Sequence, residues 1–226
     1  MTLAEIRLWG RTIGAVSLED GGRFATFQYD SAFAASGIEV SPITMPLSDR
    51  VYVFPNLPER TFYGLPGLLA HFDFNQAGAY SYEQALLTIR QLNLPMEAVE
   101  EQFRRMTFNI VARNQDDHVK NIAFLMDKAG RWSLAPAFDV TYSYNPAGSW
   151  SAVHQMTMNC KRDGFTLADF RACAKAALMK RGRAEAILEG VCAAVAKWSD
   201  YAEQAQVVSA WRKQIQGNHR LGIPRT

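Results

Sequence analysis

Two short polar segments carry the residue types that phosphoryl transfer needs. The first runs from Asn114 to Asn121 as Asn-Gln-Asp-Asp-His-Val-Lys-Asn, with a carboxylate at Asp116 and an amide five residues later. The second, Ala-Pro-Ala-Phe-Asp, ends in the carboxylate of Asp139. In Mg²⁺-dependent phosphoryl transfer one carboxylate orients the attacking hydroxyl, while an amide and a second carboxylate hold the metal. The sequence therefore predicts that Asp116, Asn121 and Asp139 act at one point.

Three neighbouring side chains extend this prediction. Lys120 can meet the charge of a phosphate, His118 can donate a hydrogen bond, and Phe138 is an apolar anchor beside Asp139. The competing interpretation is an ordinary solvated turn, because loops rich in Asn and Asp are common. A second Asp behind an aromatic residue, on a separate segment, favours the site over the turn.

A packed helix and a hairpin are expected to position the two segments. Apolar residues recur at steps of three and four before the first segment, at Met96, Val99, Phe103, Met106 and Ile110. After it, residues 122–126 and 131–134 flank the turn 127–130, and this hairpin returns the chain to Asp139. On the polar face of the helix, two i,i+4 ion pairs are predicted: Glu100 with Arg104, and Glu101 with Arg105.

The remaining elements predict an α+β fold. Short β-like runs and five prolines mark residues 5–66, and the pattern becomes helical from about residue 80. Ser81 with Gln84 predicts a capped helix start. Three helices are expected after the hairpin: one capped by Thr166 and Asp169, one over about 183–197, and one that begins at Asp200 and continues through Ile215.

Composition excludes several classes of protein. The net charge of the 226 residues is +2, which gives no direct strong signal for nucleic acid binding. Three cysteines without metal-type spacing argue for a reducing compartment. No signal peptide is evident at the start of the chain and no apolar run reaches a membrane-spanning length, so we expect a cytoplasmic protein with no membrane partner.

The chain resembles the HipA-family serine/threonine kinases, the toxin components of bacterial toxin–antitoxin pairs. From His71 to about Trp198 it is similar to their C-terminal lobe, on the motifs Asp-x-His-x-Lys-Asn (116–121) and Leu-Ala-Pro-Ala-Phe-Asp (134–139). The resemblance implies Asp116 as the catalytic base. It implies ATP and Mg²⁺ as cofactors, contacted by His118, Lys120, Asn121, Phe138 and Asp139, with Asn121 and Asp139 as the metal ligands. It also implies a protein substrate and a HipB-like, antitoxin-like DNA-binding partner.

The first 70 residues look like the small N-terminal β subdomain of the same family, through the runs 54–60 and 67–70. The sequence then passes directly into the C-terminal lobe, so we expect two domains, 1–70 and 71–226. The nucleotide-binding lobe that would lie between them is missing, since no Lys precedes Lys120 and no Gly-rich phosphate loop is present. We therefore predict a poorly packed join near residue 70. We also predict exposed apolar surface, which would promote self-association.

Three functions follow from these observations. The first is a HipA-like toxin kinase that is impaired because its ATP lobe is missing. The second is a non-catalytic module that docks an antitoxin-like DNA-binding protein. The third, ranked last, is a metal-dependent phosphatase or nuclease that uses Asp116, Asp117 and Asp139.

Overall fold

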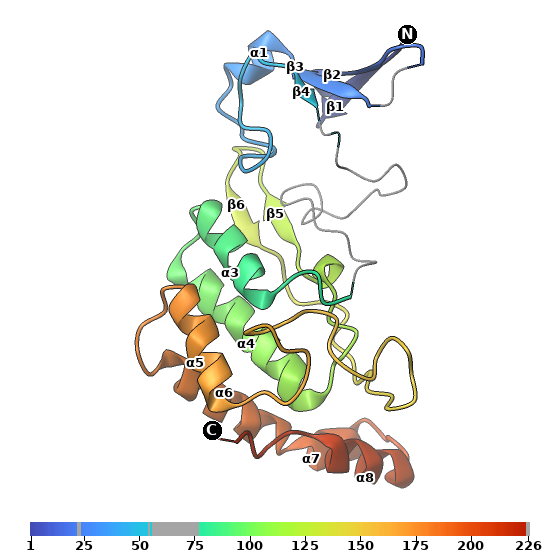
Figure 1. The fold of residues 1–226 in the computed structure, drawn as a ribbon, viewed down its shortest axis with the longest axis vertical. Helices are drawn as coiled ribbons and strands as arrows, with labels where there is room; N and C mark the ends of the chain where they lie inside the picture. Colours follow the sequence, from blue (N-terminus) through green and yellow to red (C-terminus); the bar gives the residue numbers. More distant parts are fainter. Residues whose placement is uncertain (22–23, 54, 56–76, 225–226) are drawn as a thin grey trace. The chain divides into compact units, whose positions relative to one another are not determined.

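The computed structural model describes residues 1–21, 24–53, 55 and 77–224. They form the expected α+β fold, with a four-stranded sheet followed by a mainly helical region and a hairpin (Figure 1). The chain divides into two compact units, Met1–Asp73 with Phe124–Ser133, and Phe74–Ala123 with Leu134–Thr226. The predicted domain boundary and the predicted join near residue 70 stay predictions, because residues 56–76 lie outside the described part. The same holds for the runs 54–60 and 67–70 and for His71.

The first unit contains an antiparallel sheet in the order β1-β2-β3-β4. Its strands are β1 (Thr2–Leu8), β2 (Arg11–Leu18), β3 (Thr26–Tyr29) and β4 (Tyr52–Val53). Trp9 and Gly10 join β1 to β2 with φ values of 50° and 79°, the left-handed geometry that two-residue hairpins favour. At Gly14 a Cβ atom would lie 2.3 Å from the Gln28 carbonyl oxygen, so close pairing with β3 requires glycine there. Both glycines thus have roles within the sheet.

Aromatic residues form the core of this unit. Ile13, Tyr29, Phe33 and Tyr52 are buried together, and Phe33 comes from the short helix α1 (Ser31–Ala34). The predicted hairpin is confirmed as β5 (Phe124–Met126) paired with β6 (Trp132–Leu134). The Trp132 indole donates to the Glu39 carbonyl oxygen at 2.9 Å, which fastens the hairpin to this unit.

The second unit is built around α4 (Met96–Ala112), which follows α3 (Tyr82–Gln91). Ser81 and Gln84 form the predicted capping box at the start of α3. The predicted apolar stripe of α4 is its core face: Val99, Phe103, Met106 and Ile110 are all 0% exposed. Burial on this scale makes α4 a rigid support for the polar segment that follows it.

Two details of the helical prediction are wrong. Glu100 forms its ion pair with Arg183, the first residue of α6 (Arg183–Val195), at 2.5 Å, and Arg104 pairs with Glu101 at 2.7 Å. The last predicted helix is two helices, α7 (Trp198–Gln204) and α8 (Ser209–Asn218). Gln206 adopts a left-handed φ of 57°, which no continuous right-handed helix permits.

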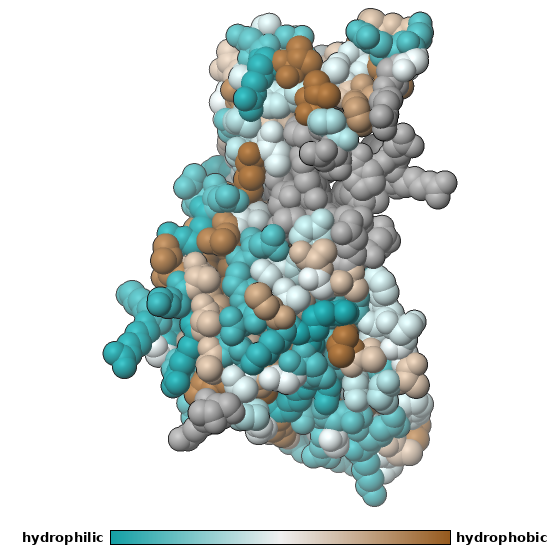
Figure 2. All heavy atoms as spheres, in the orientation of Figure 1, coloured by the Kyte–Doolittle hydropathy of each residue, from teal (hydrophilic) through white to brown (hydrophobic). Residues whose placement is uncertain are grey.

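The first two helices predicted after the hairpin are present in the structure. α5 spans Leu167–Ala176 and α6 spans Arg183–Val195. Hydrophilic side chains cover most of the visible face of the helical unit, and hydrophobic ones are scattered among them (Figure 2). No helix in the described part of the chain combines the length and the hydrophobicity needed to span a membrane. Self-association stays a prediction.

Asp169 belongs to the capping box at the start of α5, where Thr166 is the N-cap. Its carboxylate is 2% exposed and accepts hydrogen bonds from the Lys161 ammonium, the Asn159 amide and the Thr166 backbone N–H. Burial raises the pKa of Asp169, but these donors and the Thr166 hydroxyl together outweigh it and bring the pKa down to about 2. The ionised form is therefore bound more tightly by the folded chain than by the unfolded chain.

We expect Asp169→Asn to lower the free energy of unfolding by roughly 2 kcal/mol at pH 7. Because the folded pKa is lowered, this contribution is fully present above the unfolded value near 3.8 and is lost as the pH falls towards 2. Urea denaturation at pH 7 and at pH 3 measures it, with the exposed Asp200→Asn as the control. An equal difference between wild type and variant at both pH values would contradict the assignment.

Candidate active site

The polar segment begins with a sharp change of direction at the end of α4. Arg113 adopts a left-handed conformation with φ of 62°, and the Asn114 N–H donates to the Asn109 carbonyl oxygen at 2.9 Å. The Arg113 guanidinium donates to the Asn218 carbonyl oxygen at 2.9 Å and stacks over the Tyr144 ring. Contacts from distant parts of the chain thus hold this bulky residue in an unfavourable backbone region.

One hydroxyl group fixes the backbone of the loop. Ser143 Oγ accepts from the N–H groups of Gln115 and Asp116 at 2.8 and 2.9 Å, and donates to Asn114 Oδ1 at 3.1 Å. The Ser143 N–H also donates to the Arg113 carbonyl oxygen at 3.2 Å. These four bonds bind the segment after Asp139 to the loop that carries Asp116.

The Asp116 side chain lies at the surface of the site and is held at one oxygen. Its Oδ1 accepts from the Trp150 indole N–H at 2.8 Å and lies 3.9 Å from His118 Nε2. The side chain is 42% exposed, so a solvent molecule or a substrate can reach it. The Asn121 side-chain nitrogen donates to the Asp116 carbonyl oxygen at 2.9 Å. That bond uses the amide nitrogen, so the amide oxygen keeps the lone pairs that a metal would use.

Asp139 is held in an unusual backbone conformation. Its φ is 53°, and its carbonyl oxygen accepts from the Asn114 side chain at 3.3 Å. Upstream, the Arg105 guanidinium donates to the Ala135 carbonyl oxygen at 2.8 Å, and the Ala135 N–H donates to the Ala123 carbonyl oxygen at 2.9 Å. Left-handed residues other than glycine are uncommon and concentrate at functional sites.

A cavity of about 30 Å³ brings four of the predicted residues together. His118, Asn121, Phe138 and Asp139 all contribute to its walls. This is the space of about one water molecule. Asp116 is outside the lining and is connected to it through Asn121, while Lys120 lies in the short 3-10 helix Val119–Asn121. Among the described residues, no cluster of three His, Cys, Asp or Glu side chains could hold a metal by itself.

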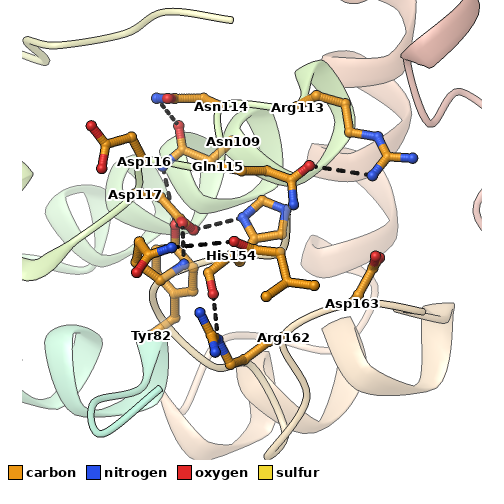
Figure 3. Close-up of polar contacts among 12 residues, drawn as sticks. Tyr82, Asn109, Arg113, Asn114, Gln115, Asp116, Asp117, His154, Arg162 and Asp163 are labelled. Atoms are coloured by element: carbon orange, nitrogen blue, oxygen red, sulfur yellow. Dashed lines mark hydrogen bonds and ion pairs between the residues drawn. The ribbon is translucent and has the colours of Figure 1, made fainter. Parts of the chain in front are cut away.

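Two residues of the site were not predicted from the sequence, and a third has a different position from the one expected. Ser143 and Trp150 lie 27 and 34 residues beyond Asp116, in a stretch whose apolar residues follow no helical or strand spacing. The one signal for Trp150 is its position as a large aromatic residue among Gly and Ser. Asp117 was expected to act only in the third function, a metal-dependent phosphatase or nuclease. It is 1% exposed and its carboxylate points into the core, towards His154, whereas Asp116 points away (Figure 3). Asp117 also lines the cavity, but its carboxylate already accepts three hydrogen bonds, which leaves it less capacity to bind a metal or a water molecule.

Ser143→Ala tests the importance of the hydroxyl. The substitution leaves the N–H groups of Gln115 and Asp116 without their acceptor, so we expect a loss of about 1–3 kcal/mol in stability. The amide signals of both residues should shift or broaden in ¹H–¹⁵N spectra. Ser133→Ala, at an exposed position of β6, is the matched control and should change neither quantity. Unchanged amide signals in Ser143→Ala would show that the loop keeps its shape without this residue.

Comparison with known proteins assigns a family to this chain. A sequence profile of the HipA-like C-terminal domain matches residues 49–199. No curated protein sequence matches the chain significantly. Among solved structures, the Shewanella oneidensis MR-1 toxin–antitoxin complex of HipA, HipB and operator DNA matches with a TM-score of 0.56 at 10% sequence identity. The match covers 87% of this chain and 57% of the matched chain in that complex. At 10% identity it shows a shared fold. Because the profile covers more than half of its residues, the chain belongs to the HipA-like C-terminal domain family.

Proposed function

We propose that this chain carries the catalytic half of an ATP- and Mg²⁺-dependent serine/threonine protein kinase site of the HipA-like toxin type. In this proposal Asp116 is the catalytic base that orients the substrate hydroxyl. Asn121 and Asp139 are the metal ligands. His118, Lys120 and Phe138 contact the nucleotide.

The observation that supports the proposal best is the shared cavity of Asn121 and Asp139. The two residues come from separate segments, yet both line one space of about 30 Å³. Mg²⁺ prefers oxygen ligands and is commonly held by one or two carboxylates together with phosphates and water. One amide oxygen and one carboxylate fit that donor set. When bound, the ion would neutralise charge on the phosphates during transfer.

The surroundings of Asp116 fit the role of a base. The Trp150 indole fixes one carboxylate oxygen, and the partial exposure of the side chain leaves room for a hydroxyl group to approach. A base must lie within hydrogen-bond reach of the proton that it accepts, and a fixed, accessible oxygen satisfies that condition. His118 Nε2, at 3.9 Å, is near enough to add a positive potential if it is protonated.

The upstream sequence argues that activity is impaired. Kinases normally place a lysine on a strand before the catalytic loop, where it pairs with the phosphates, and this chain has no Lys before Lys120. Positioning and charge stabilisation supply most of the rate in phosphoryl transfer. We therefore expect slow transfer or none by this chain alone.

The missing lysine also favours a second candidate function, a non-catalytic module that docks an antitoxin-like DNA-binding protein. The solved structure that matches is part of a complex of HipA, HipB and operator DNA, and the match covers 57% of the matched chain in that complex. Under this alternative the polar loop serves as part of a folded surface, and binding of ATP is not required. A direct test of nucleotide binding distinguishes the two functions.

Calorimetric titration of Mg²⁺-ATP into the wild type and Asp139→Asn provides that test. Asn tolerates the left-handed backbone at this position but removes the charge, so we expect affinity to fall by roughly tenfold or more. Asp200→Asn, an exposed change on α7, should bind like the wild type. Absence of binding by a folded wild type would favour the docking module, and equal affinity in Asp139→Asn would exclude Asp139 as a ligand.

Asp116→Ala should separate chemistry from binding. The side chain contacts the acceptor hydroxyl in our proposal and not the metal, so Mg²⁺-ATP affinity should stay at the wild-type level. Any transfer of labelled phosphate should disappear, and stability should change by less than about 0.5 kcal/mol because the residue is near the surface. A large fall in melting temperature would instead make Asp116 a structural residue.

A further inference from the structure

A buried polar network lies directly behind the candidate base. The Asp117 carboxylate accepts three hydrogen bonds, from the Tyr82 hydroxyl at 2.5 Å, His154 Nδ1 at 2.8 Å and the Gln155 N–H at 2.8 Å. Figure 3 shows Tyr82, Asp117 and His154 grouped below the loop. Asp117 and His154 are 1% and 0% exposed, so these bonds are made without competition from water.

The protonation states of this network follow from its outermost member, Arg220. One guanidinium nitrogen of Arg220 lies 3.2 Å from His154 Nε2. A guanidinium only donates, so Nε2 must accept, which places the single ring proton on Nδ1, facing Asp117. Burial raises the pKa of Tyr82, and the charge of Asp117 adds to the effect, so the phenol keeps its proton as well. The Asp117 carboxylate is therefore the acceptor in all three of its hydrogen bonds, and Arg220 contacts the opposite side of the His154 ring.

The same network reaches the side chain of Asp116 by a second path. His154 is followed by Gln155, whose side-chain nitrogen donates to the Trp150 carbonyl oxygen. Trp150 in turn holds Asp116 Oδ1 through its indole. The pair His154–Gln155 thus supports both the backbone next to Asp116, through Asp117, and the residue that orients the Asp116 carboxylate.

Arg220 is itself fixed at the end of α4. Its N–H donates to the Val111 carbonyl oxygen at 2.9 Å, and its guanidinium also forms an ion pair with Asp163. Two residues earlier, Asn218 contacts Arg113 and the Tyr142 hydroxyl. The segment after α8 is therefore bound to the point where the loop begins.

We propose that Arg220 is a positioning residue for Asp116, acting through His154 and Asp117 on the loop and through Gln155 on Trp150. The role of Asp116 as a catalytic base rests on the proposed function. The positioning of its side chain by Arg220 does not. The proposal means that a residue from the segment after α8 sets the geometry of a loop more than 100 positions earlier in the chain. A network that only fills the core would not transmit changes at Arg220 to the Asp116 carboxylate.

The Trp150 indole N–H is a direct reporter of that carboxylate in ¹H–¹⁵N spectra. Its signal can be assigned among the five Trp residues with Trp150→Phe. In Arg220→Met we expect this signal to shift towards the position of a solvent-exposed indole. The ring nitrogen signals of His154 should change too, because Nε2 loses its donor. Arg171→Met, which removes an exposed ion pair with Glu185, is the control and should move neither signal.

The spectra of the Arg220 variants, recorded at one neutral pH, decide the proposal. A folded Arg220→Met whose Trp150 signal stays at the wild-type position overturns it, even if the His154 ring signals change. If that variant does not fold, Arg220→Lys takes its place, since lysine keeps the charge but cannot reproduce the fork of donors. An intermediate shift of the Trp150 signal then supports the proposal, and a wild-type spectrum overturns it. No nucleotide is present in this experiment, so failure to bind Mg²⁺-ATP would not affect its result.

Discussion

The buried carboxylate of Asp117 is the constraint on which the candidate site depends. A carboxylate that is 1% exposed must be fully hydrogen-bonded, and here Tyr82 of α3 and the adjacent residues His154 and Gln155 supply the donors. Each donor is fixed in turn by the fold. Because Asp117 is tied into the core, Asp116 must face the other way, towards solvent. The exposure of the candidate base is thus a consequence of the burial of its neighbour.

A second constraint joins the loop to the segment of Asp139. Ser143 and Asn114 connect the two by side-chain bonds, and Arg105 fixes the approach to Asp139 from α4. The oxygen donors that a magnesium ion would need come from both sides of this junction. Preorganisation of this kind is what phosphoryl transfer demands of a protein, since the reaction depends on positioning and charge. The geometry therefore agrees with the catalytic side of the proposed kinase site, although the sequence before it offers no lysine for the phosphates.

The sequence predicted those parts of the structure that depend on local pattern. The apolar stripe of α4, the capping box at Ser81 and the β5–β6 hairpin each follow from spacing within a dozen residues. The meeting of Asn121 with Asp139 was predicted from residue type, and their roles stay predictions. Ser143 and Trp150 could not be predicted, because their contacts join residues 27 and 34 positions apart through a stretch without regular structure.

The errors have the same origin. Glu100 pairs with Arg183 rather than with Arg104, and that choice depends on how α6 packs against α4. The break between α7 and α8 lies at a left-handed glutamine, a residue type that gives no local signal for such a turn. Asp117 was grouped with its neighbours by chemistry, and only the fold shows that it faces the core. For Glu100 and Asp117, contacts between residues distant in the chain set the outcome, and a local pattern does not contain them.

The central claim is that the loop and the segment of Asp139 form one site for a metal and a nucleotide. Paramagnetic broadening by Mn²⁺-ATP in ¹H–¹⁵N spectra tests it most directly, because Mn²⁺ accepts the same oxygen ligands as Mg²⁺ and broadens signals only nearby. Our account predicts selective loss of the Asn121 side-chain and Asp139 backbone signals, restored when excess Mg²⁺-ATP is added. Sharp signals at both residues, or broadening centred elsewhere, would contradict it.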